Sequence, residues 1–308
     1  EEFILNTKNK NYTFLEVDLA NKSKTFEALK VTNPDLIFHL AAESHVDRSI
    51  DNPLSFLNSN IIGTFNLIEV VRKYLKNQKS NNFRLLHIST DEVFGSLGEI
   101  GLFNEQSPYA PRSPYSASKA ASDHLINSWH HTYGLPTLIT NCSNNYGPWQ
   151  FPEKLIPLMI INALSNKNLP IYGNGLNIRD WLYVDDHCRA IQVVIEKGKL
   201  GETYNIGGDN EITNIEIVEN ICAILDKEKP LHNGKLYNEQ ITFVADRPGH
   251  DFRYAIDATK IKQELGWEPN ESFETGIKKT VLWFIENRDW WQKIQKLKYK
   301  QERLGMVK

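Results

Sequence analysis

Apolar residues in the first two-fifths of the chain alternate between short runs and helical spacings. The short runs predict four strands, at Tyr12–Val17, Leu36–Leu40, Arg84–Ile88 and Thr137–Asn141. The helical spacings predict two helices, at Asn52–Tyr74 and from Pro114 to about Tyr133. Strands that alternate with helices in this way are typical of a parallel α/β sheet of the Rossmann type.

After Pro148 the pattern loosens, and proline, glycine and aromatic residues become frequent. Helices are expected at Glu216–Leu225 and Phe273–Asn287, and Gly201–Gly207 is expected to return to the main sheet. We therefore expect a dinucleotide-binding domain and a smaller α/β domain that captures the substrate. The predicted ranges are 1–143 plus about 180–215 for the first, and 144–179 plus about 216–308 for the second.

Polar clusters follow three of the predicted strands, at Ala41–Asp47, Ser89–Glu92 and Cys142–Pro148. Ligands of open α/β sheets bind outside the carboxyl ends of the strands. We expect the three clusters to converge on one cleft.

Composition narrows the possible partners. The net charge of −3 gives no general attraction to nucleic acid or to anionic membranes. Apolar runs such as Leu155–Ile161 are too short to span a bilayer, and no secretory signal is visible. Cys142, Cys188 and Cys222 are widely spaced without a metal-ligand pattern, so we interpret them as reduced core thiols of a cytoplasmic protein and expect no metal.

Two groups of side chains can carry chemistry. Tyr115 and Lys119 lie four residues apart on a predicted helix, so a nearby ammonium is expected to lower the phenol pKa and to make a base. Asp91 and Glu92 are adjacent carboxyls that can act as acid and base if their pKa values differ. The alternatives are a surface helix pair and a solvated turn, and the position directly after an apolar strand favours chemistry.

Further polar groups suit a phosphorylated ligand. Arg179 and Arg247 offer cations for a pyrophosphate, although each taken singly is typical of a surface ion pair. Asn144 and Asn145 form a turn by composition, and their amides can also orient a ligand.

Several motifs together resemble those of a known family. Four of them resemble extended short-chain dehydrogenase/reductases that act on nucleotide sugars: His39–Ser49, Ser89–Gly95, Tyr115–Lys119 and Asn144–Pro148. Asp246–Asp257 looks more specifically like the dTDP-glucose 4,6-dehydratase family, whose Thr-Asp-Glu triplet separates it from epimerases and decarboxylases. The resemblance runs over nearly the whole chain.

The resemblance implies a role for each catalytic group. Tyr115, helped by Lys119 and Thr90, would oxidise C4 of the glucose ring while hydride passes to NAD. Glu92 would then remove the C5 proton, and Asp91 would protonate the departing C6 hydroxyl. Return of hydride to C6 would give dTDP-4-dehydro-6-deoxyglucose, for deoxysugar biosynthesis.

The resemblance also implies binding residues and a homodimer. Residues expected to contact NAD are Ala41, Ala42, Ser59, Tyr115, Lys119 and Asn145. Residues expected to contact the nucleotide sugar are Ser44, Thr90, Asn144, Lys154, Leu155, Pro170, Ile171, Tyr172, Arg179, Asn214, Arg247 and His250. The family's dimer packs the two helices predicted at Asn52–Tyr74 and Pro114–Tyr133.

The chain departs from the family at its start. It begins at Glu1, and its first glycine is Gly63, so the family's Gly-x-x-Gly-x-x-Gly turn and the acidic residue for the adenosine ribose are absent. We therefore expect a truncated chain with weak NAD binding, in which the Tyr12 and Leu36 strands are separated by missing neighbours. Alternatives are a UDP-glucose dehydratase, a nucleotide-sugar epimerase or decarboxylase, and a catalytically silent nucleotide-sugar binder.

Overall fold

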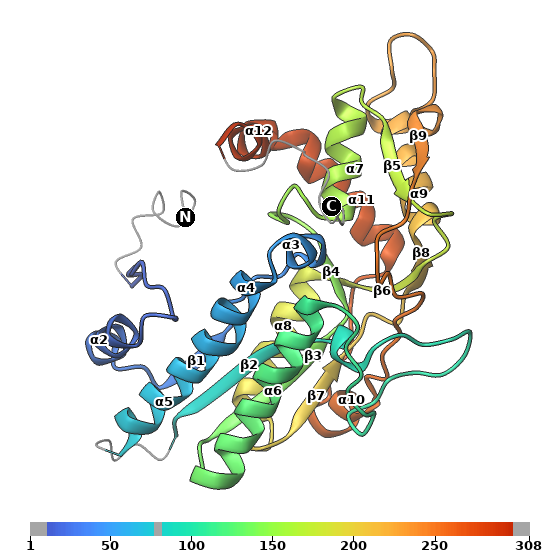
Figure 1. Cartoon of the computed structure of the whole chain (residues 1–308). Helices are drawn as coiled ribbons and strands as arrows, with labels where there is room; N and C mark the ends of the chain where they lie inside the picture. Colours follow the sequence, from blue (N-terminus) through green and yellow to red (C-terminus); the bar gives the residue numbers. More distant parts are fainter. Residues whose placement is uncertain (1–10, 77–81, 298–308) are drawn as a thin grey trace.

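The computed structural model describes residues 11–76 and 82–297, and its centre is a sheet of parallel strands (Figure 1). The strands lie in the order β1 (Leu36–His39), β2 (Arg84–Thr90), β3 (Thr137–Cys142) and β7 (Thr203–Ile206). All three pairings are parallel, so the carboxyl ends of the strands share one edge. This confirms the predicted α/β fold and the return of the segment around Gly201–Gly207 to the sheet.

Helices cover both faces of this sheet (Figure 1). On one face lie α5 (Gly63–Leu75) and α6 (Pro114–Tyr133), and on the other lie α8 (Val184–Lys197) and α10 (Thr259–Leu265). Leu85 packs with the first pair and Leu86 with the second, because successive strand residues point to opposite faces.

Helix α6 has the bounds that the sequence predicts. It starts at a capping box between Ser113 and Ser116, with Pro114 in its first turn, and ends at Gly134 in the left-handed conformation. These signals fix where the helix begins, and so which face carries Tyr115.

The predicted helix at Asn52–Tyr74 is one continuous helical segment, Pro53–Leu75, with a π-helical stretch inside it. It comprises α4 (Pro53–Phe56), η1 (Leu57–Ile62) and α5. By length and composition alone it could cross a membrane, contrary to the expectation that no segment is long enough. Half of it is buried in the protein, and its buried Asn60 and Asn66 make hydrogen bonds inside the fold, as expected for a core helix.

The second half of the chain builds its own hydrophobic cluster. Its strands are β4 (Asn144–Tyr146), β6 (Ile178–Tyr183), β8 (Glu211–Thr213), β5 (Leu169–Tyr172) and β9 (Ile241–Val244). Its helices are α7 (Leu155–Leu164), α9 (Asn214–Glu228), α11 (Phe273–Glu286) and α12 (Arg288–Leu297). Helices α9 and α11 confirm the two helices that the sequence predicts here. The remaining elements are α2 (Lys22–Thr32), α3 (Val46–Asp51), η2 (Asp91–Phe94) and η3 (Tyr237–Gln240).

The predicted strand at Tyr12–Val17 is wrong: this segment is irregular and pairs with no strand among the described residues. A strand needs a partner for its backbone groups, and within the described chain β1 is the edge of the sheet. Leu36 and Phe38 on β1 are accordingly 43% and 41% exposed, and Phe14 is 46% exposed.

The interpretation of the cysteines as core thiols also needs one correction. Cys222 is buried and Cys142 is half-buried, but Cys188 is exposed on α8. All three are free thiols, as the sequence predicts.

Candidate active site

The two adjacent carboxyls lie where β2 ends and the chain turns into the short helix η2. Strand β2 is longer than predicted and includes Ser89 and Thr90. The Thr90 hydroxyl accepts a hydrogen bond from the Glu92 backbone N–H at 3.3 Å and donates one to Asp91 Oδ1 at 3.2 Å. This cap fixes the turn, so that neighbouring residues project in different directions.

The surroundings of the two carboxyls differ in electrostatics. Burial raises the pKa of Asp91 well above its usual value, and the negative charges of Glu92 and Asp180 raise it further. Burial also raises the pKa of Glu92, but there the cations Arg247, Arg179 and Lys154 oppose the shift. Burial thus favours the protonated form of both groups, and among the described residues the opposing cations are more numerous at Glu92, where there are three, than at Asp91, where only Arg179 acts. The assignment of Asp91 as acid and Glu92 as base stays a prediction.

The phenol of Tyr115 faces the same turn from the first turn of α6. Its side chain is 8% exposed, and it hydrogen-bonds with Thr90. Burial raises the pKa of this phenol well above its usual value, and the charge of Glu92 adds to the shift. The expected lowering of the phenol pKa is therefore wrong for this structure.

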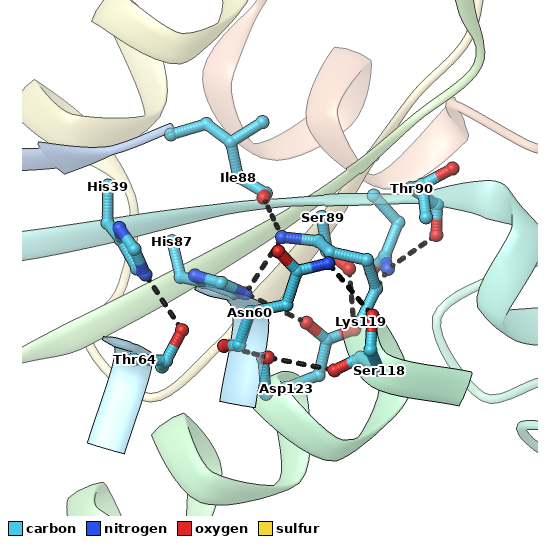
Figure 2. A network of polar contacts seen from close by, with 12 residues as sticks. His39, Asn60, Thr64, His87, Ile88, Ser89, Thr90, Ser118, Lys119 and Asp123 are labelled. Carbon is cyan, nitrogen blue, oxygen red and sulfur yellow. Dashed lines mark hydrogen bonds and ion pairs between the residues drawn. The ribbon is translucent and has the colours of Figure 1, made fainter. Parts of the chain in front are cut away.

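The reason is the direction of the Lys119 side chain (Figure 2). Its ammonium donates to the Ile88 carbonyl at 2.8 Å and lies 3.4 Å from His87 Nε2, on the sheet side of the helix. Burial lowers the pKa of Lys119 itself. Sequence spacing places Tyr115 and Lys119 on one face, but it cannot show which acceptor the ammonium finds.

Groups from the second half of the chain meet the segment after β1. Arg247 donates to Asp47 Oδ1 at 2.6 Å, and the Tyr172 hydroxyl donates to Asp47 Oδ2 at 3.1 Å. The ring of Tyr172 lies against His250, with the centroids 6.2 Å apart, and His250 contacts Asp246 at 2.6 Å. Asp47 thus joins two of the predicted substrate-binding residues, although its place in a motif was the only signal in the sequence that could have selected it.

Two further cations that act on Glu92 are held by backbone carbonyls. Lys154 donates to the Ser44 carbonyl at 2.6 Å, which ties the start of α7 to the segment after β1. Arg179 is 5% exposed, donates to the Ile178 and Asp251 carbonyls at 2.7 and 3.0 Å, and stacks on Tyr254 at 4.4 Å. The interpretation as a surface ion pair is wrong for Arg179, which is buried and bound to carbonyls, whereas Arg247 does form an ion pair, with Asp47, and this pair is largely buried.

The three polar clusters therefore converge as predicted. Asp47 from the first cluster binds Arg247, and the charge of Arg247 acts on Glu92 in the second. In the third, Cys142 donates to the Ser89 carbonyl at 3.4 Å.

The remaining residues predicted to contact the substrate differ in how far they are buried. Ile171 is buried in the hydrophobic cluster of the second half, so only its backbone is available to a ligand. Pro170 is its half-buried neighbour on β5, and Leu155 is half-buried at the start of α7. Asn214 begins α9, and its backbone N–H donates to the Asn177 carbonyl.

The residues predicted for NAD include one unpartnered polar atom. Among the described residues, the buried Oδ1 atom of Asn145, predicted for NAD, and that of Asn144, predicted for the nucleotide sugar, have no hydrogen-bond partner, so both are acceptors available to a bound molecule. Ala41 and Ala42 follow β1 at the carboxyl edge of the sheet, and Ser59 is half-buried in η1. Within the described ranges, no group of three or more His, Cys, Asp or Glu side chains is arranged to hold a metal ion.

Comparison with known proteins agrees with this geometry. Residues 3–280 match the family model for GDP-mannose 4,6 dehydratase. A probable dTDP-glucose 4,6-dehydratase of Sinorhizobium fredii is 56% identical over 97% of this chain and 85% of the relative. The dTDP-glucose 4,6-dehydratase of Neisseria meningitidis is 55% identical over 97% of this chain and 86% of its own length.

Solved structures show the same likeness. The dTDP-glucose 4,6-dehydratase DesIV of Streptomyces venezuelae, solved with NAD and dTDP bound, is 41% identical with a TM-score of 0.86, over 96% of this chain and 86% of that one. The Bacillus anthracis enzyme in complex with NAD is 47% identical with a TM-score of 0.82, over 93% and 84% of the two chains. With the Thr90-Asp91-Glu92 turn, Tyr115 and Lys119 at the carboxyl edge of its sheet, this chain belongs to the dTDP-glucose 4,6-dehydratase family.

Proposed function

We propose that this protein is an NAD-dependent lyase that converts dTDP-glucose into dTDP-4-dehydro-6-deoxyglucose. The observation that carries the proposal is the pair of adjacent carboxyls, Asp91 and Glu92, next to Tyr115, with a negative neighbour at Asp91 and three cations near Glu92. An epimerase or a decarboxylase needs no such pair. Family membership supports the same reaction.

Each side chain has one task in the proposed reaction. NAD, when bound, supplies the acceptor and later the donor of one hydride. Tyr115 accepts the proton of the C4 hydroxyl, with Thr90 as its hydrogen-bond partner. Glu92 removes the C5 proton made acidic by the new C4 ketone, and Asp91 gives its proton to the C6 hydroxyl, which leaves as water.

The binding assignments follow from where the side chains lie. For the nucleotide sugar, the cations Lys154, Arg179 and Arg247 surround Glu92 and suit a diphosphate. Ser44, Thr90, Asn144, Leu155, Pro170, Ile171, Tyr172, Asn214 and His250 complete the proposed set. For NAD, the proposed contacts are Ala41, Ala42, Ser59, Tyr115, Lys119 and Asn145, all near the carboxyl edge of the sheet.

Three broader assignments belong to the same proposal. The separate hydrophobic clusters support the division into a cofactor domain and a sugar-nucleotide domain at the predicted ranges. A homodimer packed through the Pro53–Leu75 helix and α6 is supported by Leu54, Leu57 and Ile62, which are 62%, 43% and 44% exposed on the first half of the Pro53–Leu75 helix. Free thiols and a helix that is half-buried in the core support a cytoplasmic enzyme without a membrane or nucleic-acid partner.

The decisive experiment is incubation with dTDP-glucose and added NAD, followed by the alkali-induced absorbance of a 4-keto sugar. UDP-glucose in a parallel reaction tests the alternative nucleotide, and Tyr115→Phe is the inactive control. A second chain carries at its N-terminus the strand, glycine-rich turn and helix of a relative. If only this extended chain forms product, the low activity of the shorter chain is due to weak cofactor binding. Absence of product from both chains, with nucleotide sugar still bound, would favour a silent binder over the dehydratase.

A further inference from the structure

Behind Lys119 lies a fully buried pair of titratable groups for which the proposed reaction has no use (Figure 2). His87 and Asp123 are 1% and 0% exposed. His87 Nε2 lies 3.4 Å from the Lys119 ammonium and 3.1 Å from Asp123 Oδ1. One imidazole nitrogen therefore separates a buried cation from a buried carboxyl.

The fold places these groups together by simple periodicity. Tyr115, Lys119 and Asp123 follow one another at intervals of four residues on α6, so they share the face that packs on the sheet. His87 and Ser89 alternate on β2 and point to that helix. The arrangement is a polar layer inside the core.

Hydrogen bonds hold the carboxyl of Asp123 in place. Its Oδ2 accepts from Ser89 Oγ at 2.8 Å and from the Tyr109 hydroxyl at 2.9 Å. Burial raises its pKa to about 6, so the group is ionised in neutral and alkaline solution. Burial, and then the charge of Lys119, lower the pKa of His87, so its ring stays neutral.

The neutral ring of His87 lies between the two charged groups. Its Nε2 is within hydrogen-bond distance of the Lys119 ammonium, which also donates to the Ile88 carbonyl. Among the described residues, His87 Nδ1 and Asp123 Oδ1 are buried without a hydrogen-bond partner. Asp123 therefore acts on Lys119 through its charge, across the edge of the imidazole ring.

We propose that Asp123, acting across His87, is a positioning residue that holds the charged ammonium of Lys119 against the Ile88 carbonyl at the end of β2. The proposal rests on the proposed function, in which Lys119 assists Tyr115. Other groups also face the Lys119 ammonium: Cys142 acts on it from β3, and it acts on His39 on β1. Of its neighbours, Asp123 has the largest effect in favour of the charged form.

The direct test is the pKa of Lys119, measured by NMR in protein labelled with carbon-13 at lysine Cε and assigned with Lys119→Arg. Asp123→Asn keeps the shape of the side chain and removes its charge. For charges within about 6 to 7 Å in a protein interior, the Lys119 pKa is expected to fall by about one to two pH units. Tyr109→Phe is the matched control, because it removes one hydrogen bond to Asp123 without removing the charge, and it is expected to leave the Lys119 pKa in place.

Two further measurements complete the test. If Asp123→Asn does not fold, the Lys119 signal of the unaltered protein is expected to shift with a midpoint near pH 6, where Asp123 loses its proton. In the NAD-loaded enzyme, the alkaline limb of kcat is expected to move to lower pH in Asp123→Asn but not in Tyr109→Phe. An unchanged Lys119 pKa would overturn the proposal, and so would a changed pKa with an unchanged alkaline limb. The NMR measurement needs no turnover, so a failure of the proposed dehydratase activity is recognised separately.

Discussion

Asp91→Asn tests whether the first of the two carboxyls works as a neutral acid. The amide has nearly the shape of the protonated carboxyl and can still donate a hydrogen bond, but it has no acidic proton to give. Loss of a general acid slows the step it serves by about 10²- to 10⁴-fold. Oxidation at C4 needs Tyr115 and does not need Asp91, so NADH is expected to accumulate in a single turnover while the 4-keto-6-deoxy product forms slowly.

The same substitution has a thermodynamic signature that follows from burial. The folded-state pKa of Asp91 is raised above its unfolded value, so the folded protein binds this proton more tightly. The contribution of the group to stability is then greatest below about pH 4 and falls as the pH rises towards the folded-state pKa, by roughly 1 kcal/mol per pH unit. The Asn variant lacks this loss. Its free energy of unfolding relative to the unaltered protein should therefore increase with pH by that slope.

Urea unfolding at several pH values above 4 measures the difference, and absorbance of NADH measures the kinetic effect. Asp35→Asn is the matched control, because this substitution makes the same chemical change at an exposed position. Parallel stability curves for Asp91→Asn and the unaltered protein would show that Asp91 is ionised in the fold. Product formation at the unaltered rate would refute its role as the acid.

Three further substitutions test other parts of the site and the fold. Glu92→Gln should block removal of the C5 proton yet permit reduction of NAD; loss of NAD reduction with substrate still bound would contradict the assigned roles. Asp47→Asn should free Arg247 from its 2.6 Å contact with the Asp47 carboxyl. In steady-state kinetics, KM for dTDP-glucose is expected to rise by about tenfold or more while kcat changes little. An equal loss in kcat would instead show that Asp47 takes part in the chemical step. Gly276→Ala should destabilise the protein by about 1 to 3 kcal/mol in urea unfolding, because its Cβ would lie 2.2 Å from the Tyr146 hydroxyl, and an unchanged midpoint would show that Tyr146 can move.

Local signals explain which elements the sequence could predict. The bounds of α6 follow from Ser113, Pro114 and Gly134, which are a cap, a first-turn proline and a left-handed terminator close to the helix ends. Strands β2 and β3 are apolar runs buried on both faces, and such runs are visible without any tertiary information. Tyr12–Val17 is a similar apolar run, but it forms a strand only if another strand pairs with it. The composition of the run cannot show whether such a partner is present.

The site shows the same division between local and distant causes. Tyr115, Lys119 and the adjacent carboxyls are recognisable because their spacing is short. The role of Asp47 is not, because its partner Arg247 is 200 residues away and belongs to another part of the fold. The direction of the Lys119 side chain could not be predicted for a related reason. Its acceptor is the Ile88 carbonyl on β2, and only the packing of α6 on the sheet brings the two together.

The split between Asp91 and Glu92 depends on both halves of the molecule at once. Residues one apart in a 3₁₀ turn project about 120° from each other, so the turn at the end of β2 gives the two carboxyls different neighbours. Burial and the charges of Glu92 and Asp180 oppose ionisation of Asp91. Burial also opposes ionisation of Glu92, but there Arg247 and Lys154 act in the other direction. The sheet alone would therefore bury two similar acids, and the charges that distinguish them, Asp180 as well as Arg247 and Lys154, come from the second half of the chain.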